Sequence, residues 1–471
     1  MATPTADSYV ADAGATVSAG RSLSSSGLDY VLDLLEAAPA ESWVQLNADT
    51  NTFGSVGPPN DLRANYGGIP APTEPIQGVW PSFAWDPIDH RIILWGGGHA
   101  NTSANEVYEW RCDTREWHLS FHASEMVQVN SFPTFRSAGF NDAPVSSHTY
   151  GSNAFLTQQR RFWTFGGAAH GTGNTLAVYD PSSGAVLRSA GGYSASMALA
   201  RQGRVAGAYG TNNKRGSYAG VNLDGADAWR LHDWFGKPSG SPVFGGAAYN
   251  KHIECGAAAT VEGGKDVLYY TAASGTSPAL LRVEFVDSNP LNDLHALVGS
   301  TDGQPTGGVG STGQGILALS ATAGLVVRLM GGNNSGHYLR FCDLKRTWGF
   351  SNGWRTPTLT GPDTAEFYAL ELHRAGLVWN PVKGCFTVWN LGRQVWEIAV
   401  PAGNPTPDTG WTLTKVAMNT ATPAPRSAYQ ANESGILGKF RWADDLRAAV
   451  TTFGNYSGEV WAYKPAGWTR G

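Results

Sequence analysis

Short runs of alternating hydrophobic and polar positions follow one another along most of the chain, separated by turns rich in glycine. The longest apolar runs, such as Arg91 to Trp95 and Gly324 to Met330, have the length of a strand and are too short to span a bilayer. One phrase recurs: a strand, a turn, a second strand ending in Gly-Gly, a polar loop, an aromatic third strand, a turn and a short strand with Trp. Its clearest copy runs from Phe83 to Phe121 and reads FAWDPIDHRIILWGGGHANTSANEVYEWRCDTREWHLSF.

Seven copies of this phrase can be placed along the chain. Their second strands lie near residues 93, 163, 206, 268, 327, 386 and 450, with a mean step of about 60 residues. Because a four-stranded sheet cannot bury both of its faces alone, the copies have to stack around an axis. The pattern therefore predicts an all-β fold, a seven-bladed β-propeller with four-stranded blades.

The seventh copy has no fourth strand of its own, whereas Ser42 to Asn47 has the pattern of a strand without a neighbour in sequence. Pairing the two would close the ring and remove an exposed sheet edge. We therefore predict two parts. Residues 1–41 form an N-terminal arm with an amphipathic helix, and residues 42–471 form the propeller, closed by the strand near 42–47.

The predicted helix follows three serines that could cap it, and Leu28, Val31, Leu32 and Leu35 fall on one of its faces. Two interpretations remain open for this face. It could pack on the propeller of the same chain, or it could anchor the chain in a larger assembly.

Composition narrows the functional classes. The chain has 59 Gly and 18 Trp but only 15% charged residues, which argues against a coiled coil and against acidic disorder. The net charge is −5 and the basic residues are scattered, so we expect neither nucleic acid binding nor membrane insertion. Residues 1–20 lack Lys, Arg and an apolar core, and do not have the pattern of a secretory signal. The four Cys lack CxxC spacing and are expected to be buried thiols.

The Gly-Gly pairs and the Asn-x-x-Tyr phrase that follows the first of them resemble kelch-type, galactose-oxidase-like β-propellers over residues 42–467. The form GGGHA…NEVYEW, from Gly96 to Trp110, is similar to a variant found in bacterial and bacteriophage propellers. This resemblance implies a propeller, and for the phage variant a virion protein. It brings no copper site, because the Tyr, His and modified Cys ligands of galactose oxidase cannot be placed on these positions.

Polar loops between second and third strands should meet on one face of a propeller, where Asn, His and aromatic side chains can bind sugars. The candidate ligand-binding residues are His99, Asn101, His170, Asn174, Asn212, Asn213, Asn333, Asn334, His337 and Tyr456. The alternative is that Asn and Gly occur there because they form turns, and that each His caps its own loop.

Weak catalytic candidates lie where the chain enters the innermost strands, namely His148, Glu254 and His373, since a Glu beside a His could act as a general base. We predict no metal site and no cofactor. Whether a calcium ion binds in the channel is left open, because backbone carbonyl ligands leave no trace in a sequence.

Three functional classes follow. The first, which we favour at this stage, is a bacteriophage virion structural protein, a tail or head fibre or decoration component. Its loops would bind a host-surface glycan or receptor, and residues 1–41 would hold other virion proteins in an oligomeric assembly. Such a protein would be made in the bacterial cytoplasm and reside in the virion. The second is a carbohydrate-active enzyme, a polysaccharide lyase or oxidase. The third is a kelch-like scaffold that binds proteins.

Overall fold

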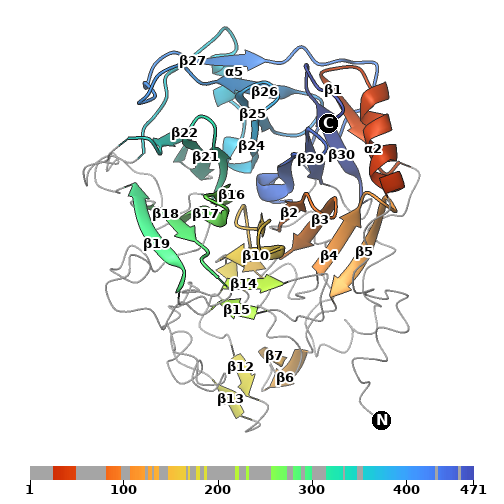
Figure 1. Ribbon diagram of the computed structural model, residues 1–471, viewed down its shortest axis with the longest axis vertical. Coiled ribbons are helices and arrows are strands. Elements are labelled where there is room, and N and C mark those ends of the chain that lie inside the picture. The colour runs from red at the N-terminus through yellow and green to blue at the C-terminus, as the bar shows by residue number, and fades with distance from the viewer. Residues whose placement is uncertain are drawn as a thin grey trace.

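The computed structural model is an all-β molecule in which small sheets stand around one axis (Figure 1). The structure describes residues 25–48, 81–96, 107–121, 126–129, 132–136, 147–165, 168–169, 177–180, 185–187, 218–221, 230–232, 256–272, 279–287, 292–299, 314–332, 335–346, 354–429, 433–453 and 458–471. Within these ranges no helix has the length and apolarity needed to cross a membrane.

Six sheets of the described residues form a ring, and each is named here by its innermost strand. The β2 sheet contains β2 (Ser82–Asp86), β3 (Arg91–Trp95), β4 (Val107–Arg111) and β5 (Glu116–Phe121). The β9 sheet contains β9 (Ala154–Leu156), β10 (Arg161–Phe165), β14 (Tyr218–Val221) and β15 (Arg230–His232). The β16 sheet contains β16 (Gly256–Glu262), β17 (Lys265–Ala272), β18 (Ala279–Glu284) and β19 (Leu294–Gly299).

The other three sheets come from the C-terminal half. The β20 sheet contains β20 (Gln314–Ser320), β21 (Leu325–Gly332) and β22 (Ser335–Asp343). The β24 sheet contains β24 (Gly376–Asn380), β25 (Cys385–Trp389), β26 (Val395–Ala399), β27 (Trp411–Lys415) and the short β23 (Leu359–Thr360). The β28 sheet contains β28 (Phe440–Ala443), β29 (Ala448–Thr452), β30 (Val460–Lys464) and β1 (Ser42–Gln45).

The innermost strands touch one another in the order β2, β9, β16, β20, β24 and β28, and β28 in turn touches β2. This closed sequence of contacts is what defines a propeller, because each sheet buries its faces against the two beside it. Short helices fill the inner rim: η5 (Leu372–Arg374) precedes β24 and η6 (Leu437–Lys439) precedes β28. A further helix, α5 (Thr364–Tyr368), lies between β23 and η5 in the chain.

The prediction of seven four-stranded blades was wrong, although the all-β propeller was right. The second and third copies of the phrase contribute to a single sheet in the ring, because β14 pairs with β10. The strands that were expected to complete the second copy, β12 (Ala177–Asp180) and β13 (Ala185–Leu187), join β6 (Met126–Val129) and β7 (Phe132–Arg136) in another sheet. The second strand expected near residue 206 lies outside the described residues.

Two further strands pair with each other outside the ring, β8 (Ser147–His148) with β11 (Ala168–Ala169).

The segment expected to be an unpaired strand near 42–47 is β1, and it runs antiparallel to β30 with Trp43 opposite Tyr463. The first and last parts of the described chain therefore share a sheet.

Large apolar side chains fill the spaces between neighbouring sheets. Trp43 is completely buried between the β24 and β28 sheets, with its ring centroid 4.8 Å from that of Trp389. Its indole N–H donates to the carbonyl of Arg393 at 2.9 Å. Cys112, Cys342 and Cys385 are buried free thiols, while Cys255 is outside the described residues.

The N-terminal helix α2 (Ser25–Ala37) packs on the propeller of its own chain. Val31, Leu32 and Leu35 are buried in the cluster between the β2 and β28 sheets. Lys464 donates to the carbonyls of Glu36 and Ala38 at the helix C-terminus, and Figure 1 shows α2 beside β1 and β30. The apolar face is therefore covered within the molecule, as in the first of the two interpretations above.

Each inner strand ends in a tight turn of the same kind. The residue before the second strand has a positive φ in all six sheets of the ring. These residues are His90, Arg160, Gly264, Gly324, Gly384 and Arg447. In three sheets this left-handed position is occupied by a residue other than glycine, which is uncommon.

Candidate functional site

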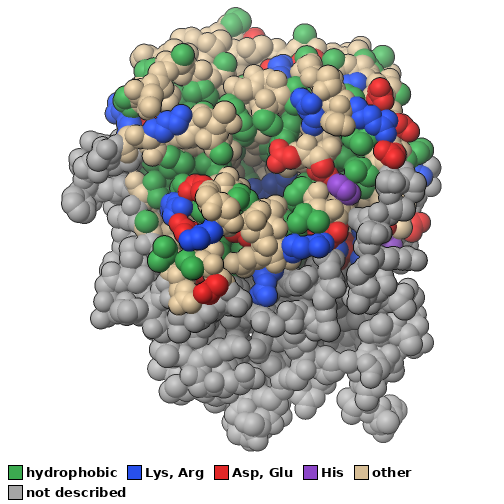
Figure 2. All heavy atoms as spheres, viewed as in Figure 1, with side chains coloured by type: hydrophobic (Ala, Val, Ile, Leu, Met, Phe, Trp, Pro, Cys, Tyr) green, Lys and Arg blue, Asp and Glu red, His purple; other side chains and the backbone are tan. Residues whose placement is uncertain are grey.

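A cavity of about 370 Å³ lies on the axis, where the six inner strands end. Figure 2 shows it as a hollow near the centre of the described surface, with Lys or Arg atoms at its floor and acidic and His side chains at its rim. The volume falls within the range of natural small-molecule sites.

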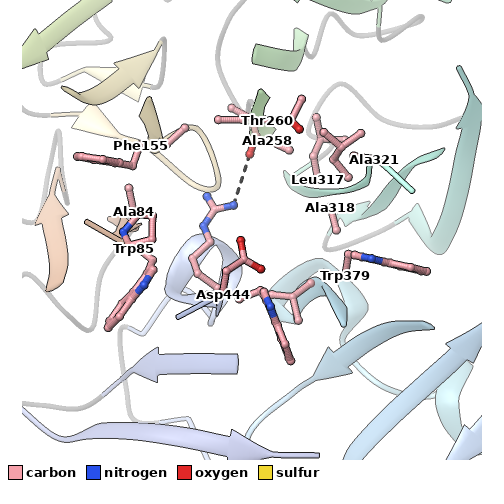
Figure 3. Close-up of a pocket in the computed structure, with 18 of the residues that line it drawn as sticks. Ala84, Trp85, Phe155, Ala258, Thr260, Leu317, Ala318, Ala321, Trp379 and Asp444 are labelled. Carbon is pink, nitrogen blue, oxygen red and sulfur yellow. Dashed lines mark hydrogen bonds between the residues drawn. The ribbon is translucent and has the colours of Figure 1, made fainter. Parts of the chain in front are cut away.

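Small side chains keep the axis open. The lining residues that project least are Ala84, Ala154, Ala257, Ala258, Ala259 and Ala318, contributed by β2, β9, β16 and β20. Larger residues at these positions would fill the channel, because the inner strands of neighbouring sheets touch. The alanines therefore give the cavity an apolar wall and leave room within it (Figure 3).

Four aromatic side chains from four different sheets also line the cavity: Trp85, Phe155, Trp379 and Trp442. Trp85 and Phe155 are almost fully buried, whereas Trp379 and Trp442 are half-buried. In Figure 3 Trp85, Phe155 and Trp379 stand around the opening on different sides. Aromatic surface beside hydrogen-bonding groups is the usual composition of a sugar site, since the rings contact C–H faces while polar groups bond the hydroxyls.

Arg441 crosses the axis from the middle of β28. Its guanidinium donates to the carbonyls of Phe83, Ala257, Gly151 and Asn153, at 3.2, 3.4, 2.9 and 2.9 Å. Figure 3 draws the bond to Ala257 as a dashed line. One side chain thereby ties together three segments, namely β2, β16 and the residues just before β9, and it forms the polar end of the cavity that it lines.

The charge of Arg441 has only neutral partners among the described residues. All four acceptors are backbone carbonyls, and burial lowers the pKa of Arg441 to about 10. Part of the side chain nevertheless stays accessible, because the cavity opens above it.

Acidic residues occupy the rim beside Trp442. Asp444 lines the cavity and is exposed to it, yet surrounding protein and the neighbouring Asp445 raise its pKa above the ordinary 3.8. Asp445 accepts the indole N–H of Trp85 at 2.6 Å through Oδ1 and contacts Nδ1 of His90 at 2.5 Å through Oδ2. The hydrogen bond that His90 donates to Asp445 raises the pKa of His90, although partial burial opposes this shift.

The rim thus contains an imidazole held by a carboxylate. Because Nδ1 of His90 is committed to Asp445, Nε2 is the ring nitrogen left for another molecule, and a quarter of the side chain is exposed. This is the arrangement that fixes a histidine tautomer and stabilises its protonated form in proton-transfer sites. Asp444, which lines the cavity, and His90, which is bonded to the neighbouring Asp445, can therefore accept and donate protons.

A second polar cluster lies at the other end of β28, and we call it the η6 cluster. Lys439 is completely buried, and burial lowers its pKa to about 7, although Glu433 opposes this shift. Glu433 is buried and pairs with the guanidinium of Arg426. The cations of Lys439 and Arg426 lie 5.1 and 4.5 Å from the centroid of Phe453.

Most residues that the sequence suggested as ligands lie outside the described residues. These are His99, Asn101, His170, Asn174, Asn212, Asn213, Asn333, Asn334, Tyr456 and, among the catalytic candidates, Glu254. The backbone of His148 is in β8 and that of His337 is in β22. His373 is buried in η5 and does not line the axial cavity.

The sequence analysis did not select the residues that line the cavity. Trp85, Trp379 and Trp442 stand at or next to the end of the first strand in three copies, in the phrases FAWDP, LVWNP and FRWADD. A tryptophan that recurs beside an Asp or Asn was the available signal, but aromatic residues in strands usually belong to the core. Within the described ranges no group of three or more His, Cys, Asp and Glu is placed to hold a metal ion.

No protein-family model and no curated protein sequence matches the chain. Among solved structures, it is similar to Bacteroides ovatus xyloglucan PUL GH43B, with 12% identity and a TM-score of 0.31, over 76% of this chain and 55% of that one. It is also similar to a thermostable family-43 glycoside hydrolase, with 10% identity and a TM-score of 0.33, over 77% and 99%. A third is the catalytic domain of the Coprinopsis cinerea GH62 α-L-arabinofuranosidase, with 9% identity and a TM-score of 0.32, over 81% and 99%.

These likenesses are too distant to transfer a residue or an activity. The seven-bladed kelch-type resemblance was wrong, because the described residues form a ring of six sheets and not seven four-stranded blades. The expectation of a bacteriophage virion structural protein, with its tail-fibre and receptor-binding role, was wrong with it, since it was carried by that resemblance. It rested on the GGGHA phrase, and one fold serves many unrelated functions.

Proposed function

We propose that this protein is a carbohydrate-active enzyme whose substrate places a sugar ring in the axial cavity. The observation that carries the proposal is the composition of the cavity: four aromatic side chains, an apolar wall of alanines, and the charged groups of Arg441 and Asp444. A sugar needs both kinds of surface, whereas an apolar ligand would leave the charged groups unsatisfied.

The rim supplies the groups for chemistry. Burial raises the pKa of Asp444 and the hydrogen bond to Asp445 raises that of His90, so a carboxyl group and an imidazole are available for proton transfer. Asp445 stabilises the imidazolium of His90, and it also holds Trp85 at the wall of the cavity. A glycan longer than the cavity would extend over this rim.

The proposal is tested by titrating the full chain with a panel of mono- and oligosaccharides. Tryptophan fluorescence and calorimetry measure the binding. Trp379→Ala should weaken binding, because it removes half-buried aromatic surface from the cavity wall. Tyr30→Ala is the matched control, since Tyr30 is an exposed aromatic residue on α2.

Turnover is measured separately by mass spectrometry of the incubated oligosaccharides. His90→Gln should abolish product formation and leave binding in place. The proposal fails if no saccharide binds the wild-type chain, or if Trp379→Ala and Tyr30→Ala bind equally well.

A further inference from the structure

We propose that the ligand of the axial cavity carries a carboxylate, and that Arg441 recognises it. This inference rests on the proposed function and names the substrate class, glycans containing an acidic sugar such as a uronic acid. It follows from the way in which the charge of Arg441 is placed.

A guanidinium has five N–H donors, and four of those on Arg441 are used by backbone carbonyls. One N–H remains, on Nη1, which makes a single bond of 3.4 Å to Ala257. The hydrogen bonds hold the guanidinium rigidly on the axis, so the entropic cost of orienting it when a ligand binds is small.

Neutral carbonyls satisfy the donors but do not neutralise the charge. Arg91, in the β2 sheet, has carboxylate partners, among them Asp86 at 2.9 Å. For Arg441 burial alone accounts for the lowered pKa, and no acidic group of the described residues offsets it. An enclosed positive charge without a counter-ion in this part of the chain is costly, and an anion entering the cavity would remove that cost.

Asp444 is an acidic residue that lines the same cavity as Arg441. It stands beyond the end of β28, at the mouth, whereas Arg441 lies within the strand. Its pKa is governed by burial, Asp445 and Trp442, not by Arg441. The two charges therefore act at different depths, and a ligand can direct its carboxylate inward and its hydroxyls toward the rim.

The experiment is calorimetric titration of the full chain with D-glucuronate, D-glucose and cyclohexanecarboxylate. The first two differ only in a carboxylate replacing a CH₂OH group, and the third has the carboxylate without the sugar. We expect glucuronate to bind at least about tenfold more tightly than glucose at low salt. This preference should shrink as salt is added, because screening weakens the charge interaction.

Arg441→Lys keeps the charge but not the planar group, and Arg441→Gln removes the charge. The preference for glucuronate should be reduced in the first and lost in the second, while Arg355→Gln leaves it unchanged. Arg355 is the matched control, since its guanidinium pairs with Asp408 at the surface. If Arg441→Gln does not fold, the carboxylate inference is tested by whether added salt reduces the preference of the wild-type protein for glucuronate over glucose.

Each outcome has one meaning. Equal affinity for glucuronate and glucose, or a preference that salt does not change, overturns the carboxylate inference while the sugar proposal stands. Binding of cyclohexanecarboxylate and glucuronate but no other saccharide supports the carboxylate inference and counts against a general sugar site. Binding of none of the three overturns both.

Discussion

Two buried cations at the junction of η6 and β28 have different settings. Lys439, the last residue of η6, is sealed from solvent beside the paired Glu433 and Arg426. Arg441, two residues later, is bonded to neutral carbonyls and opens onto a cavity. Both pKa values are lowered by burial, but only that of Lys439 is opposed by a carboxylate. The comparison teaches that a buried charge marks a ligand site when its counter-charge is missing and space is left for one.

The largest effect should come from Arg441→Met. Four carbonyls from three segments lose their donor, and hydrogen bonds to a charged group contribute about 1.5–3 kcal/mol each before the gain from removing the enclosed charge. We expect a net loss of about 3 kcal/mol in the free energy of unfolding, measured by denaturant titration. A change below about 1 kcal/mol would show that Arg441 does not tie the sheets together.

Removal of the cavity aromatics should come next. Trp379→Ala and Trp442→Ala should each weaken saccharide binding by about 1–2 kcal/mol, because each removes a ring surface from the wall. Stability should change less than for Trp43→Ala, which empties a completely buried site between two sheets. Calorimetry and thermal melts on the same three variants give both quantities. If all three variants bind saccharides equally well, the aromatic side chains of the cavity wall do not contact the ligand.

A smaller effect is expected from Asp445→Asn, and it should depend on pH. The folded-state pKa of His90 is raised above 6.5, so the folded protein binds more protons than the unfolded one in the range just above that value. The stability contributed by His90 is therefore complete below pH 6.5 and is lost as pH rises through the raised pKa. Asn can still accept the Trp85 N–H but cannot stabilise an imidazolium.

The check is the melting temperature of both proteins between pH 5.5 and 8.5. The fall in wild-type stability attributed to His90 should be absent in Asp445→Asn. A parallel pH dependence in the two proteins would mean that Asp445 does not control His90.

The smallest effect is expected from Lys439→Met. Glu433 keeps Arg426 as a partner, and replacing a buried lysine by an apolar residue of similar length removes a desolvation cost. Saccharide affinity should stay within about twofold and stability within about 1 kcal/mol of the wild type. A loss of affinity comparable to that of Trp379→Ala would show that the η6 cluster belongs to the ligand site. The proposed difference between the Lys439 and Arg441 sites would then be wrong.

The strand phrase predicted much of the fold because it is a local property. Strands β3, β4 and β5 lie where the first copy places them, and β1 is the strand expected near 42–47. The number of sheets is not local. Ala177–Asp180 and Tyr218–Val221 have similar patterns, and the choice of which one pairs with Arg161–Phe165 depends on the whole ring.

The cavity was harder to predict for a related reason. Trp85 and Trp442 have the pattern of core residues, and Arg441 has that of an exposed position in an alternating strand. Their role depends on six strand ends meeting at one axis, which periodicity within one copy does not show. The loop residues chosen from the sequence, such as Asn333 and Tyr456, lie outside the described residues and remain predictions.

The central claim is that the axial cavity holds an acidic sugar against Arg441. A crystal structure of the full chain grown with D-glucuronate tests it most directly. The account predicts the sugar ring between the aromatic side chains of the cavity, with its carboxylate within hydrogen-bonding distance of Nη1 of Arg441. A sugar bound elsewhere with the cavity filled by water, or a ring reversed so that the carboxylate faces the rim, would contradict it.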